Sequence, residues 1–157
     1  MQTIQPYLDA SFRRTCFGGR PGHDRFHALA WAEMLATTGN RWVWIVQDVK
    51  NAFPSVPRGR LEDVLHRRLP NENLVSLILK LADNGRSRGI PQGAPASPLL
   101  LNLYLDYVLD RPWERQHPDL PLLRWIDDLL ILTSDRDRQS QPSTHPRISP
   151  DTHPPRK

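Results

Sequence analysis

Apolar and polar residues recur along the first part of the chain with two different periods, which predicts both helices and strands. Residues 23–39 carry apolar side chains at helical spacing, with Asp24 as N-cap and Gly39 as a stop. Residues 42–48 are β-branched and aromatic without a helical stripe, so they predict a buried strand that ends at Asp48. The tryptophans of these two segments are expected in the core: Trp31, Trp42 and Trp44.

Three more helices are predicted before residue 111. Pro57 favours a helix start directly after it, and Asn71 is placed to cap the next helix, which the Asn84-Gly85 pair ends. Ser97 is expected as the N-cap of the third helix, with Pro98 at its first position. The predicted helices span residues 58–68, 72–83 and 98–110, and residues 85–95 form a loop.

The last apolar segment, residues 122–133, consists of two extended runs that flank Asp127 and Asp128. This pattern predicts a tight hairpin with two carboxylates at its tip. Together with Asp48, the sequence therefore places three carboxylates at strand ends. Helical and extended segments in one chain are typical of a mixed α/β or α+β domain.

Proline content changes this picture near the C-terminus. Sixteen prolines are about twice the average share of roughly 5%. Five of them lie in the last 24 residues, where Ile148 is the only aliphatic residue. Such a segment cannot bury enough apolar surface to order itself. We therefore expect a domain over residues 1–133 and a disordered tail rich in Pro, Ser, His and Arg over residues 134–157.

Several protein classes are excluded by composition. The sequence has neither an apolar stretch long enough to span a membrane nor a signal peptide, so we expect a cytoplasmic protein without a membrane partner. The single cysteine, Cys16, excludes a disulfide scaffold and a zinc ribbon. The net charge of +4 mildly favours an anionic partner, but half of this charge lies in the expected tail.

The acidic residues of the predicted hairpin suggest a metal site. A carboxylate within an apolar run is costly to desolvate unless a cation or a hydrogen-bond donor compensates it. Mg2+ prefers such oxygen ligands, and two ions held by a few aspartates can support phosphoryl or nucleotidyl transfer. From spacing alone, however, an ordinary Asp-Asp turn explains Asp127 and Asp128, and Asp48 can simply begin a turn.

Longer motifs carry more information than the carboxylates alone. In order, QPYLDASF, CFGGRPGHD, VQDVKNAF, RGIPQGAPASPLLLNLYLD and LRWIDDLLIL resemble consecutive blocks of bacterial reverse transcriptases of the group II intron and retron kind. The resemblance covers residues 4–133. Its strongest block combines the Pro-Gln-Gly loop, the Ser-Pro helix start and Asn102. It implies an α+β fold, the polymerase palm with its antiparallel sheet, packed helices and Asp-Asp hairpin, plus part of the fingers.

The resemblance also implies an activity, RNA-directed DNA synthesis by nucleotidyl transfer from a dNTP to a primer 3′-hydroxyl. It assigns two Mg2+ ions to Asp48 and Asp127, with Mn2+ as a substitute ion. Asp128 supports the site, and the carbonyl of Val49 adds a ligand. The implied partners are an RNA template, a DNA primer and the dNTP, and the sequence indicates no oligomeric state.

Four further residues acquire nucleotide-binding roles from the resemblance. Phe53 lies under the incoming sugar and excludes a 2′-hydroxyl; without the flanking motif, an ordinary buried Phe would be the preferred explanation. Gln92 and Gly93 lie against the nucleotide and the template, unless they form a simple turn. Arg20 reaches the triphosphate with its forked donors, or is a solvated surface arginine.

The sequence also departs from the family pattern. The hairpin reads Trp125-Ile126-Asp127-Asp128, where the family has another aromatic and a small residue, and His23 replaces a usual arginine. The similarity begins close to Met1 and stops at Thr133, before the rest of the palm and the thumb. We therefore expect a reverse transcriptase truncated at both ends, with a frameshift near residue 134 as the hypothesis for the second truncation.

Two other functions compete with polymerisation. One is a catalytically inactive remnant that binds RNA or a partner, which the missing thumb favours. The other is a metal-dependent phosphohydrolase, which explains three aspartates but not the Pro-Gln-Gly and Ser-Pro block. The retained aspartates favour descent from an active polymerase.

Overall fold

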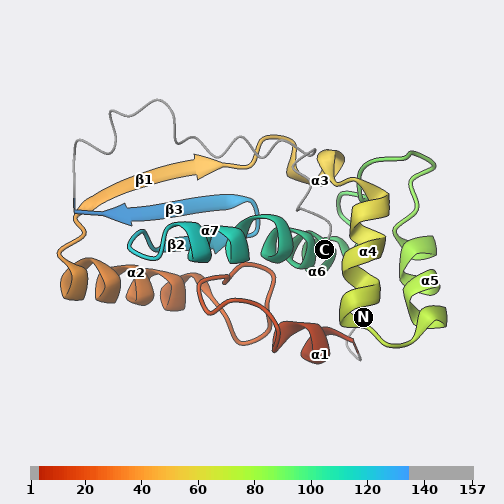
Figure 1. Cartoon of the computed structure of the whole chain (residues 1–157), viewed down its shortest axis with the longest axis horizontal. Helices are drawn as coiled ribbons and strands as arrows, with labels where there is room; N and C mark the ends of the chain where they lie inside the picture. The colour runs from red at the N-terminus through yellow and green to blue at the C-terminus, as the bar shows by residue number, and fades with distance from the viewer. Residues whose placement is uncertain (1–3, 135–157) are drawn as a thin grey trace.

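An antiparallel sheet with helices on both faces organises residues 4–134, the part of the chain that the computed structural model describes (Figure 1). Its three strands lie in the order β1-β3-β2. They span Val43–Asp48 (β1), Leu122–Trp125 (β2) and Asp128–Thr133 (β3). The expected α+β architecture and the predicted hairpin are confirmed. The expected tail lies, apart from Ser134, outside the described residues.

The central strand, β3, is apolar on both of its faces because each face is covered. Leu132 packs with Ala32 and Ala36 of helix α2 (Arg25–Gly39) on one face. Ile131 packs with Leu109 and Trp113 on the other face. The run of leucine and isoleucine in this strand is therefore the pattern of a fully covered strand. Asp24 caps α2 as predicted, accepting the His27 backbone N–H at 2.9 Å.

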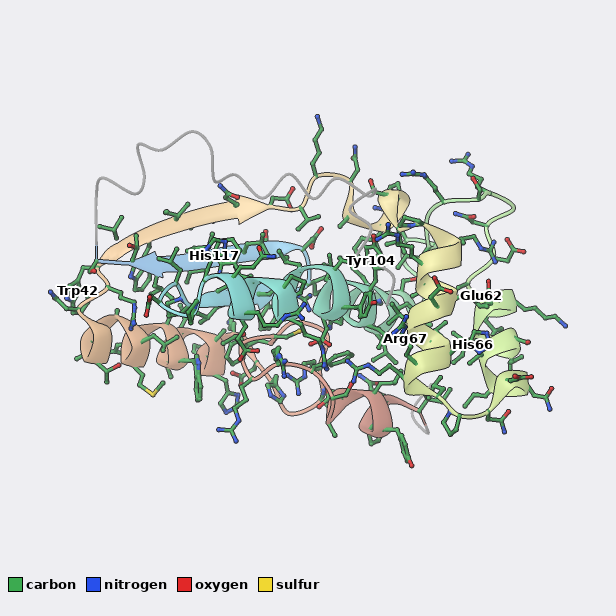
Figure 2. The ribbon with its side chains drawn as sticks, viewed as in Figure 1. Trp42, Glu62, His66, Arg67, Tyr104 and His117 are labelled. Atoms are coloured by element: carbon green, nitrogen blue, oxygen red, sulfur yellow. The ribbon has the colours of Figure 1, made fainter. Side chains whose placement is uncertain are left out.

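Strand β1 differs from its prediction, because it is an edge strand and not a buried one. Helix α2 packs over β2 and β3, so one face of β1 is left uncovered. Trp44 is 42% exposed and Val46 is 75% exposed. Trp42, at the end of the molecule (Figure 2), is 62% exposed. The expectation of a core position is thus wrong for Trp42 and Trp44, whereas Trp31, on α2 itself, is partly buried against the cluster that includes Leu132.

A second group of helices lies beside the end of the sheet at which β1 terminates (Figure 1). Helix α4 (Arg58–Arg68) follows Pro57 as predicted, and Asn71 caps α5 (Glu72–Leu81) by accepting the Leu74 N–H at 3.0 Å. Helix α5 ends at Leu81, short of the predicted residue 83. Two short helices were not predicted: α1 (Gln5–Asp9) and α3 (Ala52–Ser55).

The third predicted helix is irregular and continues beyond its predicted end at residue 110. Helix α6 (Ser97–Leu105) continues into a π-helical turn, η1 (Asp106–Asp110), and then into α7 (Arg111–Gln116). Pro112 has no N–H with which to make a regular helical hydrogen bond. One residue earlier, the Arg111 N–H donates to the Asp106 carbonyl five residues back, which is the π-helical pattern. Ser97 is the first helical residue and not the N-cap, because its hydroxyl donates to the Pro91 carbonyl of the preceding loop.

None of the helices in residues 4–134 combines the length and the apolar composition that crossing a lipid bilayer requires.

Candidate active site

Three aspartates meet at one end of the sheet. Antiparallel pairing places Asp48, the last residue of β1, opposite Asp128, the first residue of β3. Asp127 precedes Asp128 in the turn of the β2-β3 hairpin, and the Val49 N–H donates to the Asp127 carbonyl at 2.9 Å. The strand register and this hydrogen bond therefore hold Asp48, Asp127 and Asp128 together at the sheet end, as the sequence predicts.

The electrostatics of this end favour a bound cation. Burial raises the pKa of the Asp127 carboxyl, and the neighbouring charges of Asp48 and Asp128 add to that rise. Carboxylate oxygens are the ligands that Mg2+ prefers, so the donor set fits such an ion. Within residues 4–134, however, no three acidic, His or Cys side chains converge on one point as a finished metal site. Asp48 and Asp128 are exposed, so their rotamers are free to change.

Val49, the expected carbonyl ligand, directly follows Asp48 in the chain. Its carbonyl accepts the Ala52 N–H at 3.1 Å, a bond that starts helix α3. A carbonyl oxygen has two lone pairs, so one acceptor position is left for a ligand. The role of Val49 as a ligand stays a prediction.

Phe53 is connected to the Pro-Gln-Gly loop through the backbone. The Phe53 carbonyl accepts the Ile90 N–H at 3.0 Å, and the Val56 carbonyl accepts the Gly89 N–H at 2.8 Å. Gly89 has φ +92°, and a β-carbon there would lie 3.2 Å from the Pro54 carbonyl oxygen, so a larger residue would be strained at this position. The half-buried Phe53 is thus held beside the loop that carries Gln92 and Gly93.

Gln92 and Gly93 themselves are exposed at the tip of this loop. Gly93 has φ +81°, and a β-carbon at that position would meet no atom within 4 Å. The Ser97 hydroxyl anchors the loop to the start of α6 through the Pro91 carbonyl. The open space around Gly93 permits close approach by a ligand, and the nucleotide-binding roles of both residues stay predictions.

A cavity of about 260 Å³ opens beside Asp48. Two cationic side chains, Lys50 and Arg88, line it together with the hydroxyl-bearing Ser55 and Tyr104. Figure 2 shows Tyr104 on α6, and burial raises the pKa of its hydroxyl. Cations and hydroxyls around one space suit an anionic group such as a phosphate. The sequence prediction missed this set, because helical periodicity marks Tyr104 only as a core position.

Arg20 contacts Asp9 and none of the three aspartates at the sheet end, among the contacts that the structure gives for it. Its Nε donates to Asp9 Oδ1 at 2.7 Å and its Nη2 to Asp9 Oδ2 at 3.1 Å. The other N–H groups donate to the carbonyls of Asp9, Arg13 and Cys16. The side chain is 7% exposed, so the alternative of a solvated arginine is wrong. These contacts indicate a structural role, and a triphosphate contact stays a prediction that requires their release.

A buried network of polar side chains contacts the backbone of the hairpin turn. Arg124 of β2 pairs with Asp110 of η1 and with Asn102 of α6, and it reaches the Ile126 carbonyl in the turn. Arg124 and Asp110 were not identified from the sequence. The available signal was a charged residue inside the apolar run that leads to Asp127, because a buried charge needs a partner.

Comparisons with known proteins agree with this geometry. The family model described as "Reverse transcriptase (RNA-dependent DNA polymerase)" matches residues 1–150. Protein YkfC of Escherichia coli (strain K12) is 28% identical over 119 residues, which cover 68% of this chain and 31% of the relative. An uncharacterized 91 kDa protein in the cob intron of Schizosaccharomyces pombe is 32% identical over 111 residues, covering 65% of this chain and 14% of the relative.

A solved structure shows the same fold. Apo telomerase from Candida tropicalis, truncated from its C-terminal domain, superposes with a TM-score of 0.62 at 14% sequence identity. The match covers 88% of this chain and 34% of the telomerase chain. The chain thus spans about a third or less of each of these proteins.

Proposed function

The chain belongs to the reverse transcriptase (RNA-dependent DNA polymerase) family, and from that premise we propose that it extends a DNA primer on an RNA template. The observation that carries the proposal is the pairing of Asp48 with Asp128, with Asp127 tied to Val49 in the adjacent turn. The carboxylates of this sheet end are the candidate metal ligands. The cavity beside Asp48 offers Lys50 and Arg88 to phosphate oxygens.

Divalent metal ions complete this proposal. Asp48 and Asp127 would hold two Mg2+ ions, or Mn2+ in their place, with Asp128 and the Val49 carbonyl in support. Bound ions of this kind activate the attacking hydroxyl and neutralise charge on the phosphates. In the reaction the primer 3′-oxygen bonds to the α-phosphorus, the bond to the β-phosphate breaks, pyrophosphate leaves, and the hydroxyl proton is lost to water.

The remaining site residues select the substrate. The proposal is that the Phe53 ring excludes a 2′-hydroxyl and so enforces deoxyribose, and the Ile90 hydrogen bond to the Phe53 carbonyl, which holds this backbone beside the loop, supports it. Gln92 and Gly93 would lie against the nucleotide and the template on the exposed loop tip. Arg20 would contact the triphosphate only after leaving Asp9.

One observation favours a second function, binding of RNA or a partner without polymerisation. The three carboxylates do not converge as a finished ligand group in the described residues. A chain that binds nucleic acid through its cationic surface does not require that convergence.

Primer extension on an RNA template with Mg2+ and labelled dNTPs tests both functions. We expect extension by the unaltered chain and its loss in Asp127→Asn, with Asp63→Asn on the exposed face of α4 as the matched control. Extension that survives in Asp127→Asn would refute the site. RNA binding without any extension would establish the second function instead.

A further inference from the structure

Arg124 is a buried cation that contacts the turn of the aspartate hairpin. Its side chain is 1% exposed and lies on β2, three residues before Asp127. Its Nη1 donates to the Ile126 carbonyl at 2.7 Å. Because a peptide group is planar, holding the Ile126 carbonyl also fixes the direction of the Asp127 N–H. Arg124 therefore acts on the backbone that immediately precedes the Asp127 side chain.

The charge of Arg124 is balanced by Asp110. The Arg124 Nε lies 2.9 Å from Asp110 Oδ1, and the Nη2 lies 2.7 Å from Asp110 Oδ2, which is a forked pair. Burial opposes the Arg124 charge, but the Asp110 carboxylate, together with Cys16 and Asp106, raises the pKa of Arg124 overall. Asp110 is the last residue of the π-helical turn, 5% exposed. The guanidinium thus stays protonated and is fixed in orientation.

Asn102 links this pair to a second loop. Its Oδ1 accepts from Arg124 Nη1 at 2.7 Å, and its Nδ2 donates to the Gly18 carbonyl at 2.7 Å. Asn102 is fully buried. A β-carbon at Gly18 would lie 2.6 Å from the Ile126 nitrogen, so the loop is packed directly against the turn. The turn is therefore held by Arg124 and confined by Gly18.

The turn requires such support because its backbone is strained. Ile126 has φ +59°, in the left-handed region that β-branched residues avoid. A residue held there costs on the order of 1–3 kcal/mol and persists only where its surroundings dictate the conformation. The hydrogen bond from Arg124 to the Ile126 carbonyl is a contact able to do so.

We propose that Arg124, oriented by Asp110 and Asn102, is a positioning residue that holds the strained Ile126 turn and so presents the Asp127 carboxylate beside Asp48. Because its side chains are buried, the proposal gives this network no direct contact with substrate. Its kinetic consequence rests on the proposed polymerase function, whereas its structural consequence does not.

The competing explanation is that the pair merely stabilises the fold. A second, partly buried pair provides the matched control: Arg111 Nε lies 2.6 Å from Asp106 Oδ2, with side chains that are 29% and 0% exposed. This pair lies one helical turn away and does not reach the hairpin. Arg124→Lys and Arg111→Lys each keep the charge and remove a forked donor. Only the first change removes a contact to the turn.

Amide hydrogen exchange of the full chain reads the turn directly. The Val49 N–H donates to the Asp127 carbonyl, and the Leu132 N–H donates to the Pro121 carbonyl and serves as the reference. We expect Arg124→Lys to lower the protection of Val49 relative to Leu132 by about tenfold or more, and Arg111→Lys to leave this ratio unchanged. In primer extension, Arg124→Lys should lower kcat by about tenfold with KM for dNTP within about threefold.

Each result decides a different claim. An unchanged Val49 to Leu132 ratio in Arg124→Lys, or an equal drop in both variants, would overturn the positioning role. Absence of primer extension in the unaltered chain would refute the polymerase function, while the exchange ratio would still decide the role of Arg124. Should Arg124→Lys fail to fold, Asp110→Asn keeps the side-chain volume and loosens the same guanidinium, and it must lower the same ratio.

Discussion

Gly18 lies so close to Ile126 that a β-carbon at position 18 would approach the Ile126 nitrogen to 2.6 Å and its Cγ1 to 2.7 Å. Only glycine therefore fits beneath the hairpin turn at this point. Gly18 is thus a packing requirement of the site, in addition to any role in a loop.

Gly18→Ala should displace the hairpin and destabilise the chain by about 1–3 kcal/mol, because neither the backbone of the turn nor the glycine can move apart freely. Urea unfolding measures the loss, and primer extension should fall with it. Gly59→Ala in α4 is the control, since a β-carbon there meets no atom within 4 Å. That control should be neutral or stabilising, as alanine favours a helix. Equal stability of the two variants would contradict the packing described.

Asp127 should make the folded chain less stable at neutral pH than in acid. Its pKa is raised by burial and by the charges of Asp48 and Asp128. The folded chain therefore binds this proton more tightly than the unfolded chain, so the associated stability is full below the unfolded pKa and is lost as pH rises through the folded pKa. Asp127→Asn should consequently unfold at higher urea than the unaltered chain at neutral pH, and the difference should vanish in acid.

The same series gives its own control. Asp63→Asn, on the exposed face of α4, should show no comparable gain at neutral pH. A loss of stability in Asp127→Asn at neutral pH would mean that the carboxylate is compensated in the folded chain.

Arg20→Ala should destabilise the chain by about 3 kcal/mol, because it leaves the Asp9 carboxylate without its cation and removes one donor from each of three backbone carbonyls. Thermal or urea unfolding checks this value. Arg86→Ala, at an exposed loop position, should change stability by no more than about 0.5 kcal/mol. If Arg20→Ala instead raised KM for dNTP and left stability intact, the triphosphate contact would be the correct assignment.

Phe53→Val should relax the choice between deoxyribose and ribose. Removing the ring opens space for a 2′-hydroxyl, so the ratio of kcat/KM for dNTP over rNTP should fall by about tenfold. Single-nucleotide incorporation on an RNA template gives both values. Phe26→Val is the matched control, because Phe26 is 65% exposed on α2. An unchanged ratio in Phe53→Val would remove Phe53 from the site.

Local features of the site were predictable from the sequence, because they depend on residues close together in the chain. Two extended apolar runs on either side of Asp127 and Asp128 identify the hairpin. The end of β1 at Asp48 follows because the β-branched and aromatic run of residues 42–48 stops there. The end of β1 and the hairpin lie together because β1 pairs antiparallel with β3. The family resemblance implied an antiparallel sheet, and the structure confirms it.

Other features depend on distant parts of the chain and could not be predicted. Whether β1 is central or at an edge is decided by strand order, so Trp44 was expected in the core and is exposed. Arg20 appears as a free cation until the fold brings Asp9 to it. The Arg124 and Asp110 pair depends on a π-helical turn, a small irregularity without a distinct hydrophobic period.

The pairing of β1 with β3 also affects how the chain must be made. Residues 43–48 leave the ribosome long before residues 128–133, the last strand described. Until then both edges of β1 are unpaired, and Ile45 lacks the core residues that it packs against in the folded chain. Contacts between such distant residues form late, and unpaired strands attract other chains. Yield of the folded protein during synthesis should therefore depend on the delay between these two strands.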